Sequence, residues 1–212
     1  MQAAFTWMLI GVLVASVVSF LVMGLVQFGR TNSLARKAHQ MRMKFSSSDP
    51  FDVPCRYGQF ALIANGHSGR ANNVTYGRLE GWPVRAFDFR YEVGHGTRRL
   101  TRHYSVVVAE TELDLPPVLM WNERDIEGSP MAVRQSSGRL AWWFYVGSDA
   151  LAATLEEECR PLADQGVSVQ ICGSTLMLCA PVRKARQNYI QTLEKMGQIL
   201  RKVRNAPRVE PQ

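Results

Sequence analysis

The first 29 residues carry no charged side chain, and this segment limits the fold more than any other feature of the chain. Residues 3–28 are predominantly apolar. As an α-helix they would be longer than the roughly 30 Å hydrocarbon core of a bilayer, which about 20 apolar residues can cross. A cleaved signal peptide would begin with basic residues and have a shorter apolar run. The sequence therefore predicts a transmembrane anchor in residues 1–29 that contacts the lipid bilayer through residues 3–28.

The basic residues that follow this segment predict its orientation. No lysine or arginine precedes the apolar run, whereas five basic residues and no acidic ones lie in residues 30–44: Arg30, Arg36, Lys37, Arg42 and Lys44. The positive-inside rule then places the rest of the chain in the cytoplasm. We expect a single-pass protein of the cell (inner) membrane whose C-terminal domain is cytoplasmic.

Small residues recur at a spacing of four within the apolar segment, at Gly11, Ala15 and Ser19. This spacing puts them on one face of a helix, where small side chains let two membrane helices approach closely. The pattern is therefore consistent with a homodimer formed through these residues. The alternative is that the small residues have no role in association, because such residues are common in membrane helices.

The formal net charge of +7 is concentrated at the two ends of the soluble part. Acidic residues outnumber basic ones in residues 45–180, and a second basic cluster follows at Arg183, Lys184 and Arg186. A protein that binds nucleic acid would carry a basic face on its fold, so we predict no nucleic-acid partner. Both basic clusters are candidate contacts for anionic lipid headgroups. Alternatively, the first cluster only determines membrane topology.

Alternating apolar and polar residues predict a strand-rich domain after the anchor. Residues 73–80 and 82–93 are typical of a hairpin, and residues 167–172 and 175–179 of a second one. Further strands are expected at 57–65, 103–113 and 140–146, whereas 118–121 follows two prolines and is expected to be an edge strand or no strand. Ser148 is predicted to cap a helix that ends at Cys159.

The remaining segments complete the predicted organisation. Residues 1–29 are the anchor, 30–50 a basic juxtamembrane helix and linker, 51–205 a soluble α+β domain, and 206–212 a disordered tail. Residues 181–205 have the periodicity of an amphipathic helix. The predicted fold class is α+β, with an N-terminal transmembrane helix followed by a mainly antiparallel β-sheet, one inserted helix and a C-terminal amphipathic helix.

The cysteines and histidines do not form a metal-binding pattern. Cys55, Cys159, Cys172 and Cys179 include no C-x-x-C pair, and no histidine has ligand spacing around it. In a two-residue turn at Gly173 the last two cysteines would not face each other across the hairpin, so we expect reduced thiols. No metal and no cofactor are predicted.

Asp88 is the one polar residue whose position invites a functional hypothesis. It lies between Phe87 and Phe89 in a predicted strand, where burial could raise the pKa of its carboxyl group and give it a functional role. We favour a structural carboxylate that pairs with Arg78 or Arg90. No catalytic residues are predicted, and the chain is expected not to be an enzyme.

Residues 73–91 read N-V-T-Y-G-R-L-E-G-W-P-V-R-A-F-D-F-R-Y. This stretch resembles an N-h-x-x-G-x-x-x-G-x-x-V-x-x-F-D-[YF]-x-Y hairpin signature from a family of uncharacterised bacterial single-pass membrane-anchored proteins. In that family a leucine-proline segment follows, which Leu115 and Pro116 match. The resemblance covers residues 33–205 and implies the architecture alone, because the family has no assigned activity.

These features together predict a membrane-tethered, non-enzymatic cytoplasmic binding or scaffolding protein with an unidentified protein partner. The alternative from another class is a module that binds anionic lipid surfaces, by loose analogy with pleckstrin-homology domains. An unrecognised hydrolase is a third alternative, which a pocket with convergent polar groups around Asp88, Arg78 or His103 would support.

Overall fold

The computed structural model describes residues 2–135, 137–182 and 189–205, and within them nine strands form one sheet. The strand order is β1-β2-β3-β4-β9-β8-β5-β7-β6, and every neighbouring pair is antiparallel. The strands are β1 Lys44–Ser46, β2 His67–Leu79, β3 Trp82–Val93, β4 Leu100–Glu110, β5 Val118–Asn122, β6 Gly138–Arg139, β7 Trp143–Gly147, β8 Ser168–Cys172 and β9 Thr175–Pro181.

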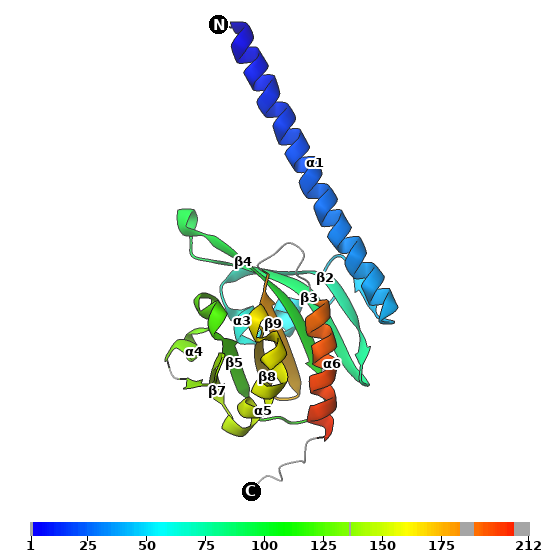
Figure 1. Ribbon diagram of the computed structural model, residues 1–212, viewed down its shortest axis with the longest axis vertical. Coiled ribbons are helices and arrows are strands. Elements are labelled where there is room, and N and C mark those ends of the chain that lie inside the picture. The colour runs from blue at the N-terminus through cyan, green and yellow to red at the C-terminus, as the bar shows by residue number, and fades with distance from the viewer. Residues whose placement is uncertain (1, 136, 183–188, 206–212) are drawn as a thin grey trace.

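Helices cover both faces of this sheet, and one long helix projects away from it (Figure 1). The α-helices are α1 Gln2–Gln40, α2 Val53–Arg56, α3 Ala61–Ala64, α4 Met131–Gln135, α5 Asp149–Cys159 and α6 Ile190–Asn205. The 3-10 helices are η1 Gly96–Arg98, η2 Glu123–Gly128 and η3 Arg160–Gln165. α1 is the projecting helix, and only its C-terminal part lies against the sheet, beside β1 and β2 (Figure 1).

Two hydrophobic cores lie on opposite faces of the sheet. One joins the C-terminal part of α1, α5 and α6 to the sheet, and the other joins α2 and α3 to the opposite face. In β3, Val84 and Ala86 belong to the first core, whereas Phe87, Phe89 and Tyr91 belong to the second. This division follows from the alternation of side chains along a strand. It places Arg85 and Asp88 of the same strand on opposite faces.

Both predicted hairpins are present. β2 and β3 join at Glu80 and Gly81, which have φ angles of 53° and 90°, as a tight two-residue turn requires. β8 and β9 join at Gly173 and Ser174, with Cys172 opposite Thr175 and Ser168 opposite Cys179. The two cysteines are therefore not cross-strand partners, and all four thiols are free, as predicted.

Three predicted elements differ in the structure. Residues 57–65 are not a strand but contain α3, because Tyr57, Phe60 and Ile63 are buried at helical spacing. The segment after Pro117 is not an edge strand, since all five residues of β5 are buried and β5 lies between β7 and β8. Residues 44–46 form β1, which pairs with β2, so the chain enters the sheet within the predicted linker.

The predicted transmembrane anchor is wrong. α1 is continuous from Gln2 to Gln40. In the part of the chain that the structure describes, no helix is both long and apolar enough to cross a membrane. The fold is a nine-stranded antiparallel sheet with helices. Its N-terminal helix, α1, is not a transmembrane span. The predicted single-pass topology and the inner-membrane localisation with a cytoplasmic domain are corrected with it.

The positions of the cysteines predict an order of thiol reactivity. Cys55 is exposed and Cys172 half-buried, whereas Cys159 and Cys179 are buried. Burial raises the pKa of the Cys159 thiol to about 12 and also raises that of Cys179, so little reactive thiolate forms at neutral pH. Alkylation followed by mass spectrometry should therefore label Cys55 first, and Cys159 and Cys179 only after denaturation. Rapid labelling of either buried cysteine in the native protein would contradict this fold.

Candidate functional site

The C-terminal part of α1 is attached to the sheet by apolar packing and an ion pair. Leu34 and Ala38 are buried against the core shared with α6. One turn before Leu34, Arg30 Nη2 lies 2.8 Å from Asp88 Oδ1 of β3, and the two side chains are about one-fifth exposed. Because Arg30 and Asp88 are 58 positions apart, this contact joins the helix to the hairpin.

Asn73 extends this contact into a polar network. It lies at a register shift in β2 between Asn72 and Thr75, with a φ of 52°, a conformation that asparagine tolerates better than most residues. Its Nδ2 donates to Asp88 Oδ2 at 2.9 Å, and its Oδ1 accepts from Thr31 Oγ1 at 3.2 Å. Asn73 and Asp88, two polar residues of the hairpin signature, therefore bind each other and α1.

Tyr189 joins this network to the segment that leads into α6. Its buried hydroxyl donates to the carbonyl oxygen of Asn73 at 2.7 Å. Because a phenol has one proton, the Thr75 hydroxyl, 2.9 Å away, donates to Tyr189 in turn. Burial raises the pKa of Tyr189, so the phenol stays protonated and keeps this arrangement.

Asp88 is thus a paired carboxylate, but its partner is not Arg78 or Arg90. Arg90 is exposed, and Arg78 donates to the carbonyl oxygen of Gly81 at 3.0 Å, at the far end of the hairpin. The alternation of residues along β3 could not indicate Arg30 as the partner, because Arg30 reaches Asp88 only where α1 packs beside β2. The hairpin signature was the one sequence feature that pointed to this network, since it contains both Asn73 and Asp88.

A cavity of about 500 Å³ lies where β1, β2 and β3 meet at the edge of the sheet. Four basic residues line it, two from the chain that follows α1 and two from the hairpin: Arg42, Lys44, Arg78 and Arg85. The apolar parts of the wall come mainly from Phe51, Tyr76, Pro83 and Val84. No acidic residue is among the lining residues that the structure describes.

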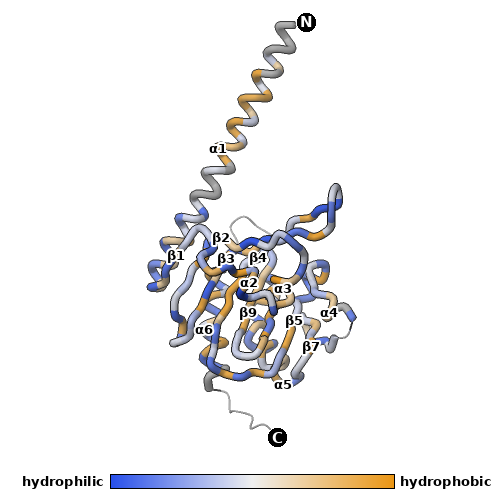
Figure 2. Tube along the Cα trace, turned by 180° about the vertical axis from the view of Figure 1, so that it is seen from behind, coloured by the Kyte–Doolittle hydropathy of each residue, from blue (hydrophilic) through white to orange (hydrophobic). Residues whose placement is uncertain are grey.

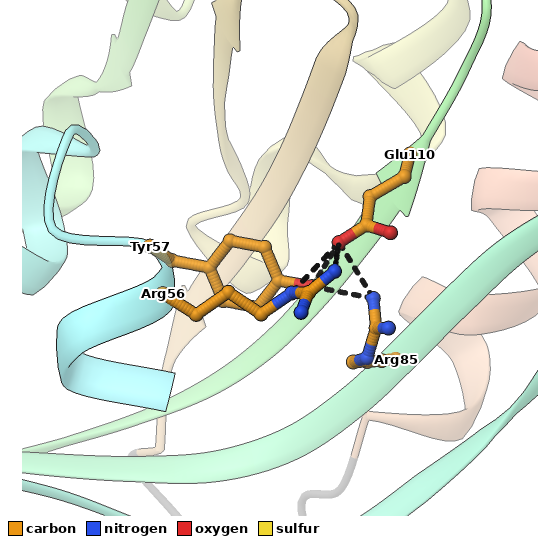
Figure 3. Close-up of polar contacts among 4 residues, drawn as sticks. All are labelled: Arg56, Tyr57, Arg85 and Glu110. Carbon is orange, nitrogen blue, oxygen red and sulfur yellow. Dashed lines mark hydrogen bonds and ion pairs between the residues drawn. The ribbon is translucent and has the colours of Figure 1, made fainter. Parts of the chain in front are cut away.

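Arg85 connects this cavity to a hydrogen-bonded cluster with Arg56, Tyr57 and Glu110 (Figure 3). Glu110 Oε1 accepts from Arg85 Nη1 at 2.7 Å, from Tyr57 Oη at 2.8 Å and from Arg56 Nη2 at 3.0 Å. Arg85 Nη1 also donates to Tyr57 Oη at 2.7 Å, and its guanidinium lies 4.7 Å from the Phe51 ring centre. One carboxylate therefore serves two guanidinium groups, which leaves an excess of positive charge.

These contacts shift the ionisation of the cluster. Burial opposes ionisation of Glu110, but hydrogen bonds from Arg85, Tyr57 and Arg56 outweigh it and lower the pKa of its carboxyl group. Burial and the hydrogen bond to Glu110 raise the pKa of Tyr57 to about 12. At neutral pH the cluster therefore holds an ionised carboxylate, a neutral phenol and two cations.

The other predicted site residues lie apart from this cavity. Arg36 and Lys37 are exposed near the end of α1, and Gly11, Ala15 and Ser19 are exposed on its projecting part. The homodimer through these three residues stays a prediction. Arg183, Lys184 and Arg186, like the predicted tail at 206–212, lie outside the described residues. Within the described residues, no group of three or more histidine, cysteine, aspartate or glutamate side chains could hold a metal ion.

Comparisons with known proteins identify a related fold. No family model matches the chain, and no curated protein matches it. The structure is similar to the crystal structure of the mycobacterial trehalose monomycolate transport factor A, TtfA, with a TM-score of 0.57 and 16% sequence identity. The match covers 87% of this chain and 99% of that chain. At this level of identity the likeness shows the fold alone. The resemblance based on the hairpin signature stays a prediction.

Replacing Asp88 with Asn should lower the free energy of unfolding by about 1–2 kcal/mol, because Arg30 loses its counter-charge in a partly buried position. Urea denaturation of the single variants Asp88→Asn and Arg30→Gln and of the double variant measures the coupling between the two residues. Asp114→Asn, at an exposed aspartate between β4 and β5, is the control and should change stability little. Additive effects of the two single changes would contradict the ion pair.

Replacing Glu110 with Gln should destabilise the fold by about 1–2 kcal/mol at pH 7, because two arginines lose a shared carboxylate. Since folding lowers the pKa of Glu110, its contribution is present above the ordinary carboxyl value of about 4.3 and is lost as the pH falls through the lowered value. The stability difference between wild type and variant should therefore shrink below about pH 4. Glu112→Gln, at an exposed neighbour, should not reproduce this dependence.

Proposed function

We propose that this protein is a non-enzymatic lipid-binding protein that contacts lipid through the apolar part of α1. The observation that carries the proposal is the exposure of large apolar side chains on the projecting helix. Trp7 is 72% exposed and Phe20 77% exposed, and every described side chain in residues 10–22 is exposed. Figure 2 shows this hydrophobic stretch of α1 and the more hydrophilic part that follows it.

The distribution of these side chains around the helix favours lipid as the partner. Exposed apolar residues occur at consecutive positions such as Val12, Leu13 and Val14, and therefore on all sides of α1. The Ser16 hydroxyl donates to the Val12 carbonyl oxygen at 2.8 Å, which satisfies this polar group within the helix. A partner helix would cover one side of α1 only, so the apolar side chains on its other sides would remain available to lipid.

Two further observations support the lipid class. Arg36 and Lys37 follow the apolar stretch and are exposed, as basic residues that meet anionic headgroups would be. The similar fold belongs to a transport factor whose name refers to trehalose monomycolate. This likeness supports lipid as the class of ligand, but it does not assign trehalose monomycolate to this chain. The absence of enzymatic activity is part of the proposal, as is an unidentified protein partner.

The test is flotation of the full chain with vesicles of neutral phosphatidylcholine, which isolates the apolar contribution from charge. Burying a side chain such as Phe20 or Leu21 contributes about 1.5–3 kcal/mol. The double variant Phe20→Ser, Leu21→Ser should therefore lower the partition coefficient at least about 100-fold. The control is Leu100→Ser, Met131→Ser, which removes two apolar side chains that are 51% and 71% exposed on the domain.

Equal partitioning of the two double variants, or no flotation of the wild type, would contradict the proposal. In that case sedimentation velocity would show whether α1 associates with itself instead. Loss of an oligomer in Gly11→Leu would then favour the homodimer through Gly11, Ala15 and Ser19.

A further inference from the structure

The cavity between β1, β2 and β3 contains more positive charge than its surroundings compensate. Arg42, Lys44 and Arg78 line it and are exposed. None of the three forms an ion pair with an acidic residue in the part of the chain that the structure describes. The fourth cation, Arg85, shares Glu110 with Arg56. The cavity therefore has three cations without a counter-charge and a fourth that is only partly compensated.

Arg85 is held in place as a fixed part of the cavity wall. Its Nη1 is bonded to Tyr57 and Glu110, and the Phe51 ring packs against its guanidinium. Its Nε is buried and has no hydrogen-bond partner among the described residues. A buried donor without an acceptor is costly and is uncommon in native proteins. Arg85 thus contributes a positive charge of fixed position to the cavity wall.

From this arrangement we propose that the cavity binds a phosphate monoester or free phosphate. A single carboxylate would supply one negative charge, whereas a phosphate monoester carries about −1.5 to −2 at pH 7 and three acceptor oxygens. Arginine forms charge-assisted, bidentate hydrogen bonds with such oxygens. The cavity volume of about 500 Å³ lies in the range of small-molecule sites, about 300–1,000 Å³. Phe51, Tyr76 and Val84 provide an apolar wall for the organic part of an ester.

The position of the cavity separates it from the apolar part of α1. The helix extends from Val22 to Gln40 before the chain reaches Arg42, which at 1.5 Å per residue is roughly 27 Å. The cavity and the exposed apolar side chains of residues 10–22 are therefore separate regions of the protein. The ligand is either a soluble phosphate compound or a phosphorylated lipid. This inference does not depend on the function proposed for α1.

The test is isothermal titration calorimetry of the full chain with three soluble probes: inorganic phosphate, glycerol 3-phosphate and dihexanoyl phosphatidic acid below its micelle concentration. We expect saturable binding at one site per chain. Tightest binding of the phosphatidic acid would assign a lipid source, and equal or tighter binding of the other two a soluble source. The double variant Lys44→Gln, Arg78→Gln should lower the affinity at least about tenfold, because it removes two of the uncompensated cations.

The matched control is Arg70→Gln, Arg90→Gln, which removes two exposed arginines from β2 and β3 that do not line the cavity. Its net charge equals that of the Lys44, Arg78 variant, so it should retain the wild-type affinity within about twofold if the cavity is the site. Equal losses in both variants, or no saturable binding of any probe, would overturn the proposal. The variant Phe20→Ser, Leu21→Ser should bind the soluble probes normally, which distinguishes failure of this site from failure of the lipid contact on α1.

Discussion

The ion pair between Arg30 and Asp88 connects the two parts of this protein, the projecting helix and the sheet. It lies in a network in which Asn73 and Tyr189 hold the carboxylate and the bulged strand in place. Partly buried charges of this kind contribute little net energy as a pair, but removing one of them is costly because the other loses its partner. The network therefore fixes the direction of α1 relative to the sheet more than it adds stability.

The direction of α1 also determines where the basic cavity forms. Leu34 and Ala38 pack into the core, the chain turns after Gln40, and β1 then pairs with β2. This path brings Arg42 and Lys44 to the hairpin that carries Arg78 and Arg85. The cations come from two segments that are adjacent only because α1 is held against the sheet.

β3 is the strand that serves both polar clusters. Asp88 faces α1 and α6, whereas Arg85 faces α2 and the cluster around Glu110. Arg85 and Asp88 are three positions apart, and because side chains alternate from one side of the sheet to the other, this odd separation puts them on opposite faces. The protein thereby separates an acid that anchors a helix from a guanidinium that lines a cavity, with apolar residues between them. The apolar part of α1 and the cavity are then two distinct regions, which we propose contact lipid and an anion, respectively.

The sequence by itself determined the elements whose signals are local. These elements are the alternation along β3, the two tight turns, the Ser148 cap and the buried stripe of α6 through Leu193 and Met196. Each is indicated by residues that lie two, three or four positions apart in the sequence. Only the tertiary structure decided which distant residues meet. It made β5 a central strand, converted the segment around Phe60 into a helix, paired Asp88 with Arg30 and assembled the cavity. The apolar run predicted a membrane span, but no helix in the described part of the chain is long and apolar enough to be one. Contacts between residues tens of positions apart depend on how elements pack, and periodicity along the chain carries no information about that packing.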